Sequence, residues 1–244
     1  MKNDQIEFIR PKRRLVMGLG SGLVSSCRSD KVLEKLLLAH ENDYLISTVD
    51  MTTGYIRFIQ SVVGGDRLWL DSGGFTLFKK QKKLGEDNPL FWAECEKMKK
   101  KFFRFLGLGN FKMCFELDNE YFRKDPDLLS PKNYLRDEIK ELTGYYPAVV
   151  FKMHQGFQYW KDLCDSTLYP ILSIGGLAQG RQWHVYRDEI GKMMKYARDK
   201  GKYVHLLGCS NVETGRFVMP DSVDFSIFRY AINLEKAKKN YLDK

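Results

Sequence analysis

Leu68-Trp69-Leu70-Asp71-Ser72-Gly73-Gly74-Phe75 joins a short apolar run to a polar, glycine-rich turn. The run is typical of a strand buried on both faces, and the carboxylate of Asp71 comes directly at its end. The glycines let backbone and ligand approach closely, and the ring of Phe75 can cover a flat heterocycle. The segment therefore predicts a strand that ends in a site for a planar, hydrogen-bonding ring, with an ordinary Asp-Gly turn as the alternative.

Similar apolar runs alternate with helical stretches along the chain. Besides 68–70, the predicted strands are 14–17, 44–49, 113–117, 148–153, 171–174, 203–207 and 223–227. The predicted helices are 91–105, 132–143 after Ser130-Pro131, 182–200 before Gly201, and 228–242. Eight strands alternating with helices in 244 residues predict an α/β fold of the compact (β/α)8 TIM-type barrel class, with a doubly wound open sheet as the alternative. No linker-like segment interrupts this pattern, so residues 1–244 are predicted to form a single domain.

Composition narrows the class of protein. Hydrophobic residues make up 43% of the chain and aromatic residues 14%, which is enough for a sizeable core. No apolar run approaches the ~20 residues of a membrane span, and the polar N-terminus has no secretory signal, so we expect a cytoplasmic protein. The five cysteines are scattered without CxxC spacing, and His154 and His205 are expected to be partly buried in strand-like contexts. We therefore expect no disulfide framework and no metal site.

The formal net charge of +9 suggests a polyanionic partner. Basic residues cluster at 10–14, 79–83 and 97–101. The second cluster begins four residues after Phe75, beside the predicted site. Phosphate contacts are therefore predicted for Lys79, Lys80, Lys82 and Lys83, with a solvated lysine-rich surface as the alternative.

Carboxylates, an amide and glycines follow the predicted strands. In either architecture ligands bind at the carboxyl ends of the strands, so these groups are expected to converge on one mouth. Carboxylates and an amide can bind the hydrogen-bonding edge of a guanine-like ring. Two carboxylates are also the minimum set for double displacement at an anomeric carbon. The groups at the strand ends are Asp71, Asp118, Gln155, Gly175, Gly176, Gly208, Asp221 and Asp224.

These motifs resemble those of the tRNA-guanine transglycosylases and their DNA-modifying relatives, in the same order along the chain. The segment 71–75 is similar to the DSGGF signature of that family, and 174–180 to its L-G-G-L-A-x-G loop. Shorter similarities are 115–118 to its F-D strand end, 153–156 to its V-Q-G segment, 206–208 to its L-x-G strand end and 221–224 to its D-x-x-D segment. The motifs extend over most of the chain.

The resemblance implies roles for individual residues. Asp224 would be the nucleophile and Asp71 the general acid/base. Phe75 would stack on the base, and Asp118 and Gln155 would bind the guanine edge. For these last two, a helix N-cap and a turn-forming amide are the respective alternatives. The full set of implied substrate-binding residues is Ser72, Gly73, Phe75, Asp118, Gln155, Gly175, Gly176, the Leu177 backbone and Asp221, the last in an orienting role.

The chain departs from the tRNA enzymes in two respects. Those enzymes carry a C-x-C-x-x-C…H zinc subdomain after the nucleophile, whereas the residues after Asp224 contain neither cysteine nor histidine. Thr76 also stands where the family commonly has glutamine. The chain is thus most similar to the compact, zinc-less branch, often phage-encoded, that inserts 7-deazaguanines into DNA; such a protein would work in the host cytoplasm.

The resemblance implies that the protein replaces guanine in DNA with a 7-deazaguanine through a covalent glycosyl-aspartate intermediate, without a cofactor. The target would be single-stranded DNA or a flipped-out guanine. The alternatives are a tRNA transglycosylase without the zinc module, a non-catalytic nucleic-acid-binding subunit, and a glycosidase that hydrolyses the base away. Members of the family are often homodimers, but no interface signal stands out in this chain.

Overall fold

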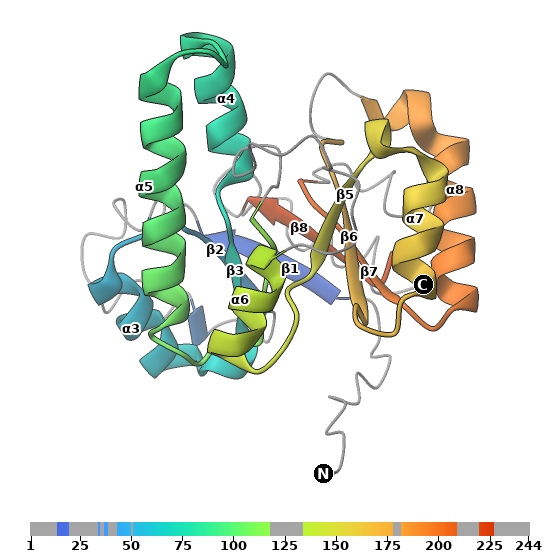
Figure 1. Ribbon diagram of the computed structural model, residues 1–244. Helices are drawn as coiled ribbons and strands as arrows, with labels where there is room; N and C mark the ends of the chain where they lie inside the picture. The colour runs from blue at the N-terminus through green and yellow to red at the C-terminus, as the bar shows by residue number, and fades with distance from the viewer. Residues whose placement is uncertain are drawn as a thin grey trace.

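The computed structural model describes residues 14–19, 34, 37–38, 43–49, 51–117, 134–177, 182–208 and 220–226. Within these ranges the chain has an α/β fold with one sheet of eight parallel strands in the order β4-β3-β2-β1-β8-β7-β6-β5 (Figure 1). The strands are β1 (Arg14–Leu19), β2 (Asp43–Ser47), β3 (Leu68–Asp71), β4 (Met113–Cys114), β5 (Val149–Lys152), β6 (Ile171–Gly175), β7 (Tyr203–Leu206) and β8 (Ser222–Ser226). All eight predicted strands are confirmed, although β4 is shorter than expected.

The first and last strands of this order, β4 and β5, are joined by hydrogen bonds between the residues at their ends. Phe115, directly after β4, forms a parallel bridge with Ala148, directly before β5. The Glu116 amide donates to the Ala148 carbonyl at 3.0 Å, and the Ala148 amide donates to the Cys114 carbonyl at 2.9 Å. Each strand thus neighbours the next one in the chain, and β1 neighbours β8. A doubly wound sheet would instead reverse its strand order beside β1.

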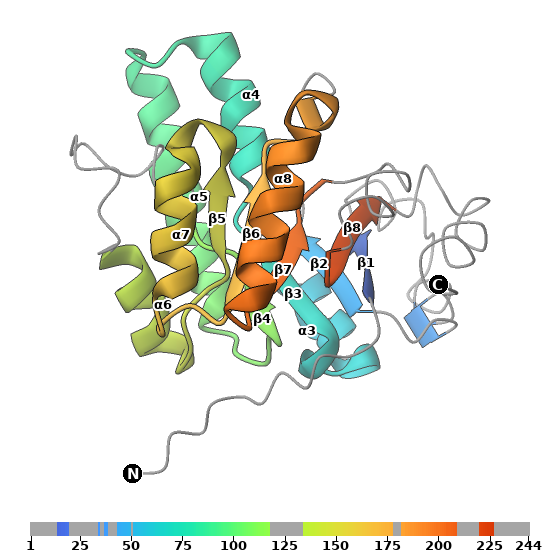
Figure 2. The ribbon, with the colours of Figure 1, turned by 90° about the vertical axis from the view of Figure 1, so that its right-hand side faces the viewer.

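Helices connect the strands and lie around the outside of the sheet (Figures 1 and 2). They are α3 (Thr53–Val63), α4 (Gly74–Leu84), α5 (Pro89–Leu106), α6 (Tyr134–Thr143), α7 (Gly156–Asp165) and α8 (Gln182–Asp199), with short turns η1 (Gly65–Arg67) and η3 (Met153–Gln155). The predictions of α5, α6 and α8 are confirmed, whereas α3, α4 and α7 were not predicted. The predicted helix at 228–242 and the Ser130-Pro131 start signal lie outside the described residues. No helix within the described ranges combines the length and the apolar character that crossing a membrane requires.

Side-chain alternation along the strands separates two faces of the sheet. Leu68 and Leu70 join the large cluster that includes buried helical residues such as Phe102 and Trp160. Trp69, between the two leucines, belongs to a second cluster that contains no helical residue. Because successive side chains of a strand point to opposite faces, every strand divides its residues in this way. We call the face of the first cluster the outer face and that of the second the inner face.

A buried ion pair between Arg136 and Glu116 lies on the outer face, where β4 and β5 meet. The Arg136 guanidinium of α6 donates from Nε to Glu116 Oε2 at 2.5 Å, and from Nη2 to the Tyr159 hydroxyl at 3.2 Å. The second oxygen of Glu116 accepts a hydrogen bond from the Val150 amide at 2.6 Å. Burial alone would lower the pKa of Arg136, but the Glu116 carboxylate raises it above its ordinary value. The guanidinium therefore stays charged and links α6 and α7 to the strands.

Candidate active site

Asp71 ends β3 on the inner face of the sheet. It follows Trp69 by two residues and so points to the same face. Its backbone carbonyl accepts hydrogen bonds from the Thr48 amide at 3.0 Å and the Thr48 hydroxyl at 2.7 Å. The end of β3 is therefore fixed to the neighbouring strand by main-chain contacts that do not use the carboxylate.

The turn after Asp71 requires glycine. Gly73 has a φ of +90°, and a Cβ atom there would lie 2.7 Å from Val49 Cγ2. Gly73 also caps the N-terminus of α4, since its carbonyl accepts from the Thr76 and Leu77 amides. Ser72 beside it is 4% exposed. The turn thus passes close to the β2 end and starts a helix immediately, as close backbone approach to a ligand would demand.

Phe75 lies in the first turn of α4 and is 53% exposed. An aromatic ring so exposed beside a strand end is available for stacking. The ammonium of Lys79, one helical turn further, lies 4.3 Å from the centroid of the Phe75 ring. The Lys82 ammonium lies over Phe78 in the same manner, at 4.4 Å. One face of α4 therefore carries two ring–cation pairs, each joining residues four apart on the helix.

Asp224 is in the middle of β8, and its neighbour Val223 belongs to the outer cluster. The Asp224 carboxylate is accordingly on the inner face, and its side chain is 16% exposed. Its Oδ1 atom accepts a hydrogen bond from the Gly208 amide at 2.6 Å and contacts His205 Nε2 at 3.2 Å. Gly208 follows the end of β7, so the carboxylate is level with the carboxyl end of its neighbour strand.

Asp221 has a different environment from Asp224, three residues later. It precedes β8, and its Oδ2 accepts a hydrogen bond from the Val204 amide at 2.8 Å. Its own amide donates to the Val204 carbonyl at 3.0 Å. Val204 is near the start of β7, so Asp221 lies toward the amino ends of the strands. The structure does not bring Asp221 together with the groups at the carboxyl ends.

The end of β5 contributes Gln155 and a residue that the sequence analysis missed. Gln155 Oε1 accepts a hydrogen bond from the Lys152 amide at 2.8 Å, as a turn-forming amide does, which leaves its NH2 group for other partners. Lys152 follows the inner-face residue Val150 by two positions and is paired in register with Gly175. Its side chain is thus on the inner face at the same end as Asp71. Its place within an apolar run is the only signal for it in the sequence.

The end of β6 has two glycines in different surroundings, one closely packed and one open. A Cβ atom on Gly175 would lie 2.9 Å from Val150 Cγ1 and 3.7 Å from Leu207 Cδ1, which are both inner-face contacts. Gly176 has a φ of +79°, with no atom within 4 Å of where its Cβ would be. The Leu177 side chain is 4% exposed and belongs to the outer cluster, so only its backbone remains for a ligand. Asp118, the remaining predicted base-binding residue, lies outside the described residues.

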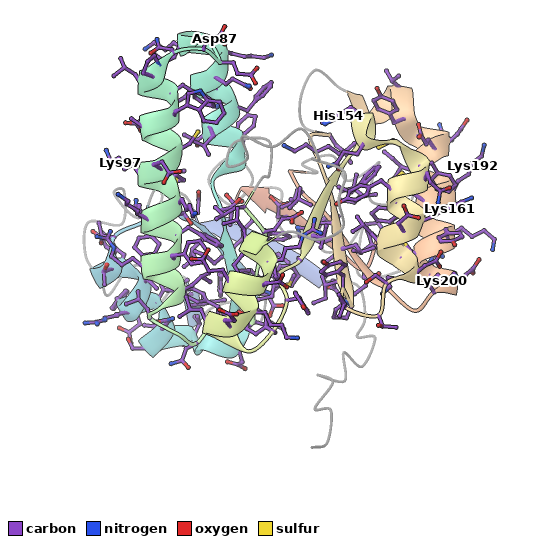
Figure 3. All side chains as sticks on the ribbon, viewed as in Figure 1. Asp87, Lys97, His154, Lys161, Lys192 and Lys200 are labelled. Carbon is purple, nitrogen blue, oxygen red and sulfur yellow. The ribbon has the colours of Figure 1, made fainter. Side chains whose placement is uncertain are left out.

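His205 is a second residue that the sequence analysis did not assign to the site. It is fully buried on the inner face of β7, where it contacts both Asp224 and Ser222. His154, by contrast, is exposed in η3 beside the start of α7 (Figure 3), so the expectation of partial burial was wrong for it. The reason is that the strand ends at Lys152, before His154.

The lysines of α4 are not equivalent. Lys79, Lys82 and Lys83 are exposed, whereas Lys80 forms an ion pair with Glu94 of α5 and lowers the pKa of that carboxyl through the hydrogen bond. Figure 1 shows that the α4–α5 hairpin extends beyond the carboxyl ends of the strands. The exposed lysines are therefore on an arm beside the site.

Two other features of the described residues concern metal binding and the cysteine thiols. No group of three or more His, Cys, Asp or Glu side chains in those ranges could hold a metal ion. Burial raises the pKa of Cys95 to about 11 and those of Cys114 and Cys164 to about 12, so these thiols stay protonated and are poor nucleophiles.

Comparisons with known proteins extend to the fold alone. The chain matches no protein-family model, and no curated protein matches it. A crystal structure of a variant of the citrate synthase SbnG is similar, with a TM-score of 0.50 and 9% sequence identity over 94% of this chain and 95% of that chain. At this identity the likeness concerns the arrangement of helices and strands and carries no information about the reaction.

Proposed function

We propose that the eight strands close into a (β/α)8 barrel of the TIM type, and that its mouth is the active site of a guanine transglycosylase acting on DNA. The cyclic strand order and the Phe115–Ala148 bridge support closure. The inner cluster supports it as well, because an inner face that contacts only strands is what the interior of a barrel provides.

The observation that carries the proposed activity is the pair of inner-face aspartates, Asp71 and Asp224. Both hydrogen bonds that the described residues make to the Asp224 carboxylate go to Oδ1. Oδ2 is then the attacking atom. A carboxylate nucleophile with a second carboxyl group as acid/base is the machinery of retaining displacement at an anomeric carbon.

In the proposed mechanism, Asp224 Oδ2 forms a bond to C1′ of the target nucleotide as the bond from C1′ to guanine N9 breaks. The electron pair goes to N9, and Asp71 donates a proton to the departing base. An incoming 7-deazaguanine occupies the same pocket and loses its ring proton to Asp71. Its nitrogen displaces the Asp224 carboxylate, so the configuration at C1′ is retained. No cofactor takes part in this sequence.

The surrounding residues suit a planar base. The turn after β6 leaves room for a ring, because a Cβ atom on Gly176 would meet no atom within 4 Å. The amide NH2 of Gln155 and the ammonium of Lys152 are donors for the carbonyl oxygen of a guanine-like ring. The exposed ring of Phe75 is suited to stacking on the base. Asp118 would complete the hydrogen bonds to the base edge.

A single-stranded nucleic acid is the preferred substrate because the rings and lysines of α4 begin directly at the β3 end. DNA is preferred over tRNA because the motifs resemble those of the zinc-less branch. Aromatic rings that stack on unpaired bases, together with cations for phosphates, are typical of single-strand binding. A target in a duplex would first have to be flipped out, at a cost of a few kcal/mol. A tRNA substrate remains the second candidate, because the same cations would contact RNA phosphates.

The test is incorporation of labelled guanine into single-stranded DNA, duplex DNA and tRNA, side by side, by the wild type and the Asp224→Asn variant. Guanine exchange does not require the natural 7-deazaguanine to be known. We expect label in DNA, together with a covalent protein–DNA adduct, and the loss of both in the variant. The Asp199→Asn change at the exposed end of α8 is the control for altered charge.

Label in tRNA alone would assign the protein to the tRNA branch. Label in neither nucleic acid would favour the non-catalytic subunit. Release of free guanine without incorporation would indicate the hydrolytic alternative.

A further inference from the structure

His205 is a titratable side chain buried beneath the proposed nucleophile. It is fully shielded from solvent and packs against the rings of Trp69 and Phe115, whose centroids each lie 5.1 Å from that of the imidazole and 6.0 Å from each other. A polar ring in such a place requires hydrogen-bond partners for both nitrogens, since a buried polar group without partners destabilises the folded protein. Both partners are present, and both belong to β8.

The two contacts determine the tautomer. Nε2 lies 3.2 Å from Asp224 Oδ1, and a carboxylate can only accept, so Nε2 carries the hydrogen. Nδ1 lies 2.7 Å from Ser222 Oγ, and in a neutral ring it accepts the hydroxyl proton of that serine. The chain of donors therefore runs from Ser222 through His205 to Asp224. Ser222 itself is fully buried, so this chain is shielded from competing water.

The network fixes one oxygen of Asp224. Oδ1 accepts a hydrogen bond from the Gly208 amide at 2.6 Å and another from the imidazole. His205 lies within β7, and Gly208 lies two positions after its end. Two donors on one oxygen define the plane of the carboxylate. The packed rings of Trp69 and Phe115 and the Ser222 contact at Nδ1 hold the imidazole in one orientation, so the second donor is preorganised.

We propose that His205 is a positioning residue that orients Asp224 so that Oδ2 faces the reacting carbon. This inference rests on the proposed function and deepens it. When Oδ2 is bonded to C1′, Oδ1 is the carbonyl oxygen of the glycosyl ester and keeps both donors. When the incoming base breaks that bond, the electron pair returns to the carboxylate, and the same donors stabilise the charge. His205 thus assists both steps without touching the substrate.

The kinetic test compares two substitutions that both fill the buried site. The change His205→Gln keeps an N–H donor near the position of Nε2, whereas His205→Leu removes it. We expect His205→Leu to lower the rate of adduct formation on the order of 100-fold, as loss of one preorganised donor does. The KM for guanine should stay unchanged, and His205→Gln should restore most of the rate. An equal loss in both variants, or no loss in a folded His205→Leu protein, would overturn the proposal.

A second measurement does not depend on activity. Long-range ¹H–¹⁵N NMR of the four histidines reports the tautomer of each ring. We expect His205 to be the Nε2–H tautomer and its Nε2–H signal to move in the Asp224→Ala variant. The Nδ1–H tautomer, or an unchanged signal, would overturn the contact even in an active enzyme. An inactive wild type with the expected signal would overturn the exchange reaction while supporting the His205–Asp224 contact.

Discussion

The two ends of the strands both carry aspartates, but they use them differently. At the amino ends, Asp43 is 4% exposed, and its Oδ2 accepts from Lys112 Nζ at 2.9 Å and from Trp69 Nε1 at 3.2 Å. Asp221 is bonded there to the Val204 amide. At the carboxyl ends, the bonds to Asp224 occupy one oxygen, and Asp71 is held through its backbone.

From this difference we expect the aspartates at the amino ends to affect stability and those at the carboxyl ends to affect the reaction. In a (β/α)8 barrel, the architecture that we propose, polar residues at the amino ends serve the fold, and those at the carboxyl ends serve the reaction. The same residue type should therefore give opposite results when it is removed from the two ends. Four substitutions test this comparison.

The largest effect is expected for Asp71→Asn at the carboxyl end. The variant keeps the shape of the side chain and the backbone bonds to Thr48, but it cannot transfer a proton. Guanine exchange should fall by about 10²–10⁴-fold, the usual contribution of a general acid/base. The midpoint of urea unfolding should stay near that of the wild type. Near-normal exchange in this variant would remove Asp71 from the mechanism.

The positions of the strands could be predicted from the sequence because the strands are buried on both faces. Short, mostly apolar runs such as Leu68–Leu70 and Ile171–Ile174 are typical of strands in such a sheet. The helices α4 and α7 were harder to predict. They begin immediately after glycine turns, and in α4 only Gly74 and Leu77 are buried, so the helical periodicity is weak.

The residues of the candidate site could be predicted only where a polar residue or a glycine directly follows an apolar run. Asp71 and Gly175 follow apolar runs directly. His205 and Lys152 lie inside such runs, and their importance depends on register: His205 pairs with Ser222, and Lys152 with Gly175. Register between distant strands is set by the whole sheet, so no local pattern reveals it.

Asp43→Ala at the amino end is expected to lower the stability of the protein without lowering its activity. The change leaves the Trp69 indole without this acceptor and the partly buried Lys112 ammonium without this counterion. The free energy of unfolding should fall by about 3 kcal/mol, measured by urea denaturation, while exchange per folded molecule stays unchanged. Asp199→Ala, which removes an exposed ion pair with Lys195, is the control and should cost at most about 0.5 kcal/mol. Lost exchange in folded Asp43→Ala protein would contradict the division between the ends.

A smaller effect is expected for Gly175→Ala. The added methyl group would meet Val150 at 2.9 Å, so the Val150 side chain or the end of β6 must shift beside the open turn at Gly176. We expect a cost of about 1–3 kcal/mol, seen mainly as a raised KM for guanine. Gly191→Ala in α8 is the matched control, because no atom lies within 4 Å of its added Cβ. This control should stabilise the protein by about 0.5–1 kcal/mol. Equal KM values for both variants would place the base elsewhere.

The smallest effects are expected on the α4 arm, which we propose as the contact with the nucleic acid. Lys83 is exposed, whereas Lys80 is already paired with Glu94. If each exposed lysine contacts one phosphate, Lys83→Gln should reduce the slope of log K against log salt by about 0.7 for single-stranded DNA. Lys80→Gln should change it less, because binding of this lysine to a phosphate competes with an existing ion pair. Lys192→Gln, on α8 at the other side of the molecule (Figure 3), should leave the slope unchanged. Equal slopes for all three variants, measured by fluorescence anisotropy, would show that the arm does not bind the strand and that the substrate approaches the mouth from another side.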